Sequence, residues 1–141
     1  MSQTVDGKCL CGAINFTAKG PFEKTSSCHC SQCARWTGGR YASTTAMRTR
    51  LHIQGEASLK WYKSSDHARR GFCSHCGSSL FWENPNSGKI DILLGTLTPP
   101  VMLEVDYHIY VGSKSDYYRI LDGKPQFVKY TDGPQINHSK D

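Results

Sequence analysis

Long apolar runs are absent from this 141-residue chain. No stretch approaches the roughly 20 apolar residues that a helix needs to cross a bilayer. The first residues carry neither the basic nor the apolar segment of a secretory signal. We therefore expect no membrane partner and a cytoplasmic location, where thiols stay reduced.

Apolar residues are also scarce, at 38% of the chain, whereas 13 glycines and 6 prolines indicate many turns. A thin core of this kind calls for another constraint, and a bound metal ion is the obvious candidate. The length suits one domain. We expect that domain over residues 1–130 and a polar, flexible tail over 131–141.

Charge of one sign is in only modest excess. Lysine and arginine number 17 against 12 acidic residues, which gives a net charge of +5. Nucleic-acid modules usually show a sharper basic stripe, so we expect no nucleic-acid partner. The positive balance suits a small anionic ligand, although most of these charges have an ordinary role on the solvated surface.

Helix signals are few, and alternation of apolar and polar residues predicts a mainly β fold. One or two helical turns are expected over residues 31–36, capped by Ser31 and closed by the glycines at 38 and 39. Gly55 suggests a hairpin between two of the strands, 51–53 and 59–61. The other strands are expected at residues 13–18, 79–83, 90–94, 101–105 and 108–111.

The seven cysteines lie in three short groups: C-x-C-G at 9–12, C-x-C-x-x-C at 28–33 and C-x-x-C-G at 73–77. An odd number of thiols in a reducing compartment favours metal ligands over disulfides. These spacings let neighbouring sulfurs reach one ion at about 2.3 Å. Zinc is the expected ion, and an iron–sulfur cluster is the rival.

The number of thiolates in each group predicts two kinds of site. The two paired groups close a tetrahedron, which is typical of a structural zinc, with ligands Cys9, Cys11, Cys73 and Cys76. The central group supplies three thiolates, Cys28, Cys30 and Cys33, and leaves one position open, as a catalytic zinc requires.

Histidines inside the clusters allow a different partition. His29 and His75 lie between ligating cysteines, where neighbours in an extended chain point opposite ways, so we expect both to be non-ligands. The remaining histidines are isolated, and we expect ordinary surface or core roles for His52, His67, His108 and His138.

Together the three motifs resemble those of the glutathione-dependent formaldehyde-activating enzymes, a family that includes the centromere protein V relatives. The likeness spans residues 5–129 and includes the stretches 108–114 and 122–127. It implies twisted antiparallel sheets around a tetrathiolate zinc held by Cys9, Cys11, Cys73 and Cys76. It also implies a second, catalytic and labile zinc held by Cys28, Cys30 and Cys33. Residues 113–118 depart from the family pattern, in which a tryptophan often follows Ser-Lys.

The resemblance also implies an activity. The chain would be a carbon–sulfur lyase that adds glutathione or another small thiol to formaldehyde or a similar small aldehyde, giving S-(hydroxymethyl)glutathione. Glutathione is anionic, and five arginines are candidates to steer it: Arg35, Arg40, Arg48, Arg69 and Arg70. The oligomeric state stays open.

Two other functions also use clustered zinc-binding cysteines. A non-catalytic zinc module would use its basic face to bind a partner, and the three-cysteine group would then store metal or hold a second structural ion. A methionine sulfoxide reductase would need a further nucleophilic cysteine late in the chain. No cysteine follows Cys76, which excludes that chemistry.

Overall fold

A computed structural model describes residues 3–136, and the chain is mainly β, as predicted. It divides into two compact units, one of residues up to 24 with 43–103 and one of 25–42 with 104 onward. Residues 137–141, with His138 and the end of the expected tail, lie outside the described part. Across residues 3–136, no helix combines the length and apolarity that a membrane span requires.

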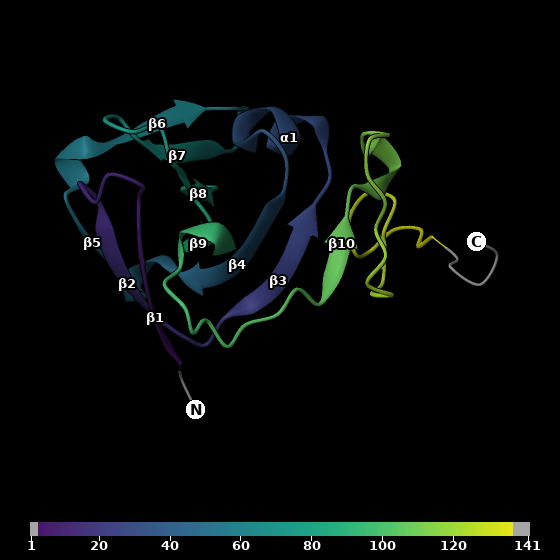
Figure 1. Cartoon of the computed structure of the whole chain (residues 1–141), viewed down its shortest axis with the longest axis horizontal. Helices are drawn as coiled ribbons and strands as arrows, with labels where there is room; N and C mark the ends of the chain where they lie inside the picture. Colours follow the sequence, from purple (N-terminus) through teal and green to yellow (C-terminus); the bar gives the residue numbers. More distant parts are fainter. Residues whose placement is uncertain (1–2, 137–141) are drawn as a thin grey trace. The chain divides into compact units, whose positions relative to one another are not determined.

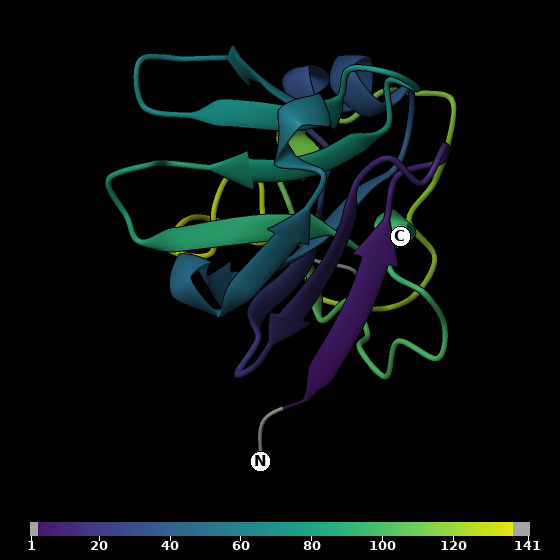
Figure 2. The same ribbon diagram turned by 90° about the vertical axis from the view of Figure 1, so that its left-hand side faces the viewer.

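The first unit contains a three-stranded antiparallel sheet of order β1-β2-β5. Its strands are β1 (Thr4–Lys8), β2 (Asn15–Lys19) and β5 (Leu51–Gln54). Figure 2 shows the β1–β2 hairpin in purple, with β5 beside β2. Alternate residues of β1 and β2 are buried, so one face of this sheet supplies core side chains such as Val5 and Phe16.

A second antiparallel run of strands in the same unit has the order β4-β9-β8-β7-β6. These strands are β4 (Tyr41–Met47), which enters the unit at Ser43, β9 (Lys89–Leu93), β8 (Ser79–Glu83), β7 (Arg69–Cys73) and β6 (Leu59–Lys63). Strands β6 to β9 can be followed in Figure 1. Phe81 of β8 meets Phe16 of β2 edge to face at 5.1 Å, so the two sheets share one core.

Two features expected within the first unit are wrong. Residues 51–53 and 59–61 do not form a hairpin, because β5 pairs with β2 and β6 pairs with β7. The chain between them passes through Gly55 (φ 85°) and the 3-10 turn Glu56–Ser58. Residues 101–105 form no strand either, although Val101 and Leu103 pack against the core as that expectation required.

The second unit places a parallel strand pair beside one short helix. Strand β3 (Glu23–Cys28) pairs from Ser26 with β10 (Tyr107–Ile109), and Ile109 is in register with Cys28. Helix α1 (Ser31–Thr37) ends at Gly38 in the left-handed conformation, as predicted. Its N-cap is Cys30 rather than Ser31.

The segment after β10 folds back on itself within the second unit. The His108 N–H donates to the Pro125 carbonyl (2.8 Å), and the Val128 N–H donates to the Pro134 carbonyl (2.8 Å). Short 3-10 turns connect the remaining segments of the described chain: Arg48–Arg50, Leu94–Thr96 and Val111–Ser113.

Candidate metal centres

Four cysteine sulfurs of the first unit lie within 4.8 Å of one another: those of Cys9, Cys11, Cys73 and Cys76. The Sγ atoms of Cys9 and Cys11 are 3.6 Å apart, and those of Cys11 and Cys73 are 3.8 Å apart. A tetrahedral zinc with sulfur at about 2.3 Å has sulfur–sulfur edges of about 3.8 Å. The four thiols therefore fit one zinc ion.

Tight turns at the ends of β1 and β7 carry these four cysteines. The Gly12 N–H donates to the Cys9 carbonyl (3.2 Å), and the Gly77 N–H donates to the Cys73 carbonyl (2.8 Å). The two turns are tied together by the Leu10 N–H, which donates to Ser78 Oγ at 2.9 Å. The arrangement therefore holds its shape through hydrogen bonds outside the sulfur cluster.

Burial distinguishes the four ligand candidates. Cys9 and Cys73 are 1% and 0% exposed and belong to the hydrophobic core, whereas Cys11 is exposed. The Ile14 N–H also donates to the Cys9 sulfur at 3.3 Å. An ion held here would join both sheets of the unit at their common core, which is the position a structural metal would need.

The three remaining cysteines come together in the second unit, and their sulfurs also lie within 4.8 Å of one another. Cys28 ends β3, Cys30 caps helix α1, and Cys33 lies in the first turn of that helix. The Cys33 N–H donates to the Cys30 sulfur at 3.3 Å. Cys33 is buried, whereas Cys28 and Cys30 are partly exposed, so a small molecule can approach the cluster.

The electrostatics of this cluster favour a bound cation. Hydrogen bonds from Cys28 and Cys33, aided by backbone N–H groups, lower the pKa of the Cys30 thiol to about 2. The same contacts, together with burial, raise the pKa of the Cys28 thiol. Cys30 is therefore ionised even without a cation, whereas Cys28 keeps its proton until a divalent ion displaces it.

The second unit contains a run of hydrogen-bonded polar side chains that no sequence pattern predicted. Tyr118 Oη lies 2.5 Å from His29 Nδ1, His29 Nε2 lies 2.9 Å from His108 Nδ1, and His108 Nε2 lies 2.8 Å from Asp122 Oδ2. We call these four side chains the histidine chain. Both ring nitrogens of His29 are engaged, in agreement with its expected exclusion from the ligand set. His108 was expected to have an ordinary role, because nothing in its spacing pointed to His29.

Burial and the nearby His108 lower the pKa of His29 to about 4. His29 is therefore neutral at pH 7. A protonated His29 would place a positive charge next to the three-cysteine cluster, because His29 lies between Cys28 and Cys30 in the chain. The neutral ring avoids that charge.

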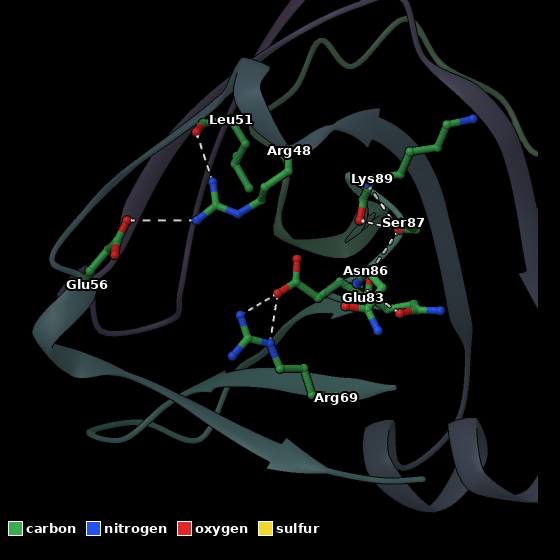
Figure 3. Close-up of polar contacts among 9 residues, drawn as sticks. Arg48, Leu51, Glu56, Arg69, Glu83, Asn86, Ser87 and Lys89 are labelled. Carbon is green, nitrogen blue, oxygen red and sulfur yellow. Dashed lines mark hydrogen bonds and ion pairs between the residues drawn. The ribbon is translucent and has the colours of Figure 1, made fainter. Parts of the chain in front are cut away.

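The five arginines have different surroundings. In the first unit, Arg48 donates to the Leu51 carbonyl (3.3 Å) and lies 4.0 Å from Glu56. Arg69 binds Glu83 at 2.5 Å and lies over the Trp61 ring at 4.0 Å. In Figure 3 the guanidinium group of Arg48 is turned to Leu51 and Glu56, and that of Arg69 to Glu83. Arg70 is 4% exposed.

The other two, Arg35 and Arg40, are exposed and belong to the unit that holds the three-cysteine cluster. Arg40 is close enough to influence both His29 and Tyr118 electrostatically. Arg40 is therefore the best placed of the five to meet an anionic ligand at this cluster.

Together, the mainly β fold and the four-plus-three grouping of thiols define a protein able to hold metal at two sites. A comparison with family models matches residues 4–113 to the glutathione-dependent formaldehyde-activating enzymes. This match spans well over half of the chain, and the protein belongs to that family of lyases.

Two further proteins are similar to this chain, and the first of them is named as a lyase. The chain is 31% identical over 124 residues to an uncharacterized lyase of Schizosaccharomyces pombe, covering 87% of this chain and 90% of that protein. It is also similar to a crystal structure of a Rhodobacter sphaeroides protein from a structural-genomics programme. That likeness has a TM-score of 0.58 and 26% identity and covers 71% of this chain and 96% of the other.

Proposed function

We propose that the protein is a zinc-dependent carbon–sulfur lyase that joins a small thiol to a small aldehyde. The thiol is glutathione or a close analogue, and the aldehyde is formaldehyde or one of similar size. The family supports this choice of substrates. The observation that carries the proposal is the convergence of three thiols with two of them partly exposed, since three protein ligands leave a position for a substrate.

The reaction is an addition in which atoms and electrons balance. The thiol sulfur forms a bond to the carbonyl carbon, the carbonyl π bond breaks, and the thiol proton ends on the new hydroxyl oxygen. No oxidant or reductant is required. The protein's task is to ionise the thiol, to hold it beside the aldehyde and to move one proton.

Zinc held by Cys28, Cys30 and Cys33 would supply a positive centre that favours the ionised form of a substrate thiol. The rest of the work falls to the chain itself. The Cys30 cap and helix α1 hold the three sulfurs close together. The positive charge of Arg40 is available to a carboxylate of the substrate. Neutral His29 adds no competing cation.

The test is exchange spectroscopy by NMR on glutathione and formaldehyde at equilibrium, with wild type and Cys30→Ser compared. The uncatalysed addition sets a background rate that is subtracted from both. We expect faster exchange with wild type alone. Equal rates for the two proteins, with no contact between glutathione and the zinc, would instead support a zinc module that binds a partner through its basic face.

A further inference from the structure

The histidine chain runs from Tyr118, beside the three-cysteine cluster, to the carboxylate of Asp122. Each step is a hydrogen bond: 2.5 Å from Tyr118 to His29, 2.9 Å from His29 to His108 and 2.8 Å from His108 to Asp122. His29 and His108 are 8% and 3% exposed, so the middle of the chain is shielded from water. Asp122 at its far end is exposed to solvent.

Asp122 fixes the direction of its hydrogen bond with His108, because an ionised carboxylate only accepts. Partial burial would raise the pKa of Asp122, but the Lys124 N–H and His108 together keep that pKa below its usual value. The Nε2 atom of His108 must therefore carry a proton. Where His108 Nδ1 carries no proton, that atom accepts, so His29 donates from Nε2 and accepts at Nδ1. The hydroxyl of Tyr118 is the donor to that atom.

Further contacts hold the Tyr118 hydroxyl in place. Its ring stacks on His29 with centroids 5.6 Å apart. Lys114 Nζ donates to the Tyr118 carbonyl at 2.5 Å and lies 4.6 Å from the centroid of the ring. His29, whose Nδ1 lies 2.5 Å from the Tyr118 oxygen, stands in the chain between Cys28 and Cys30 of the cluster. The oxygen therefore stands near the cluster with its proton committed to His29 and its lone pairs free to accept another.

We propose that Tyr118 is the catalytic residue that takes the proton of the substrate thiol and returns it to the aldehyde oxygen. His29, His108 and Asp122 are positioning residues that keep the Tyr118 oxygen ready to accept. The catalytic role rests on the proposed function, whereas the directions of the hydrogen bonds do not.

The proton movement balances. As the carbon–sulfur bond forms, the thiol proton moves to the Tyr118 oxygen, and the Tyr118 proton passes to His29 Nδ1. The Nε2 proton of His29 then passes to His108 Nδ1, so the positive charge comes to lie on His108. The carboxylate of Asp122 is 2.8 Å from that ring and stabilises the charge. The carbonyl π bond breaks in the same event and its electron pair moves onto the oxygen, which then takes its proton from Tyr118 as the other protons return.

The first test measures the hydrogen-bond directions without substrate. In zinc-loaded protein labelled with ¹⁵N, the nitrogen shifts of His29 and His108 report which ring nitrogen carries the proton. We expect both neutral rings to be protonated at Nε2, and Asp122→Asn to shift the signals of both histidines. A neutral His29 protonated at Nδ1 would overturn the proposal, because Tyr118 would then be an acceptor from His29.

The second test measures exchange between glutathione and formaldehyde for Tyr118→Phe, Asp122→Asn and Asp122→Glu. Tyr130→Phe is the matched control, because it removes the same hydroxyl from an exposed position of the same unit. Removing a general acid–base typically lowers a rate by about 10²-fold or more. We expect that loss in the enzyme-dependent rate of Tyr118→Phe, a smaller loss in Asp122→Asn, partial recovery in Asp122→Glu, and wild-type zinc content in all.

The outcomes separate this inference from the proposed function. If the wild type does not accelerate the reaction of thiol and aldehyde, the proposed function is contradicted. The nitrogen shifts of the two histidines then still test the hydrogen-bond directions. If the wild type is active and Tyr118→Phe has the same enzyme-dependent exchange rate, only the role of Tyr118 is overturned. If Tyr118→Phe does not fold, the nitrogen shifts and the activity of Asp122→Asn decide: a full wild-type rate in Asp122→Asn contradicts the relay.

Discussion

At the scale of single residues, the seven thiols differ in what surrounds them. Cys73 is 0% exposed and lies in the hydrophobic core, where an unpaired polar group is costly. Cys30 lies at the start of a helix with its side chain partly exposed. The same change of sulfur to oxygen is therefore expected to have different consequences at the two positions.

Cys73→Ser is expected to yield insoluble or unfolded protein. Structural zinc contributes on the order of 10 kcal/mol in small domains, which rivals a typical total stability of about 5–15 kcal/mol. The measurement is circular dichroism of the soluble fraction together with its zinc content, with Cys30→Ser as the matched control. A folded Cys73→Ser that holds no zinc would contradict the structural role of this cluster.

Asp91 gives a prediction about pH that does not involve the cysteines. Burial raises the pKa of Asp91 to about 6, although Thr45 Oγ1 donates to its carboxylate at 2.7 Å. In the unfolded chain the group ionises near its ordinary value of about 3.9. Between those values the folded state binds more protons, so this contribution to stability is present at low pH and is lost as pH rises toward 6.

The variant Asp91→Asn keeps an acceptor for Thr45 and cannot ionise. We expect it to be more stable than wild type at pH 7 by about 1–3 kcal/mol, and the difference to grow by about 1 kcal/mol between pH 5 and pH 7. Urea unfolding of both proteins at the two pH values measures this directly. A difference that is constant or shrinks with rising pH would show that Asp91 is ionised throughout.

At the scale of elements, the turns after Cys9 and Cys73 decide whether the four sulfurs meet. Gly77 has φ 78°, and a Cβ added there would meet nothing within 4 Å. Replacing it therefore tests the backbone conformation alone, because no atom stands in the way. Gly95 is also in open space but lacks the left-handed φ, which makes it a matched control.

Gly77→Ala is expected to lower the free energy of unfolding by about 1 kcal/mol and to weaken zinc retention, because the left-handed turn disfavours a side chain. Gly95→Ala is expected to be neutral or slightly stabilising. Competition with a coloured zinc chelator, together with thermal unfolding, measures both effects. Equal behaviour of the two variants would mean that the turn does not constrain the metal site.

Much of the fold could be predicted at this scale. Strands with one buried face alternate clearly, so strands were predicted at residues 79–83 and 90–94, where the structure has Ser79–Glu83 and Lys89–Leu93. Strand partners could not be predicted, since β5 and β6 are close in the chain but belong to different sheets. Residues 101–105 alternate in burial without pairing, because packing against a core does not require a strand.

The candidate sites likewise include features that the sequence predicted and features that it did not. Cysteine spacing located the three short groups, and local chain geometry is enough to bring Cys28, Cys30 and Cys33 together. The pairing of Cys9 and Cys11 with Cys73 and Cys76, about 60 positions along the chain, was predicted from the four ligands that a tetrahedral zinc needs. The histidine chain joins residues up to 89 positions apart, and only the parallel pairing of β3 with β10 brings His29 to His108. No local pattern carries that information, so it could not be predicted from one sequence.

At the scale of the whole molecule, each compact unit holds one thiol cluster. The four-thiol cluster lies among core residues of the first unit, whereas the three-thiol cluster lies in the second unit with the histidine chain and Arg40. We propose that the four-thiol cluster maintains the fold and that the three-thiol cluster takes part in catalysis. If so, metal can be lost from the second cluster while the first keeps its ion.

Native mass spectrometry of Cys30→Ser, purified in reductant beside wild type, tests this division most directly. We predict two zinc ions per chain in wild type and one in Cys30→Ser, with both proteins in the narrow low-charge distribution of a folded chain. A Cys30→Ser that loses all zinc and shifts to high charge states would contradict the division of the seven cysteines into four and three.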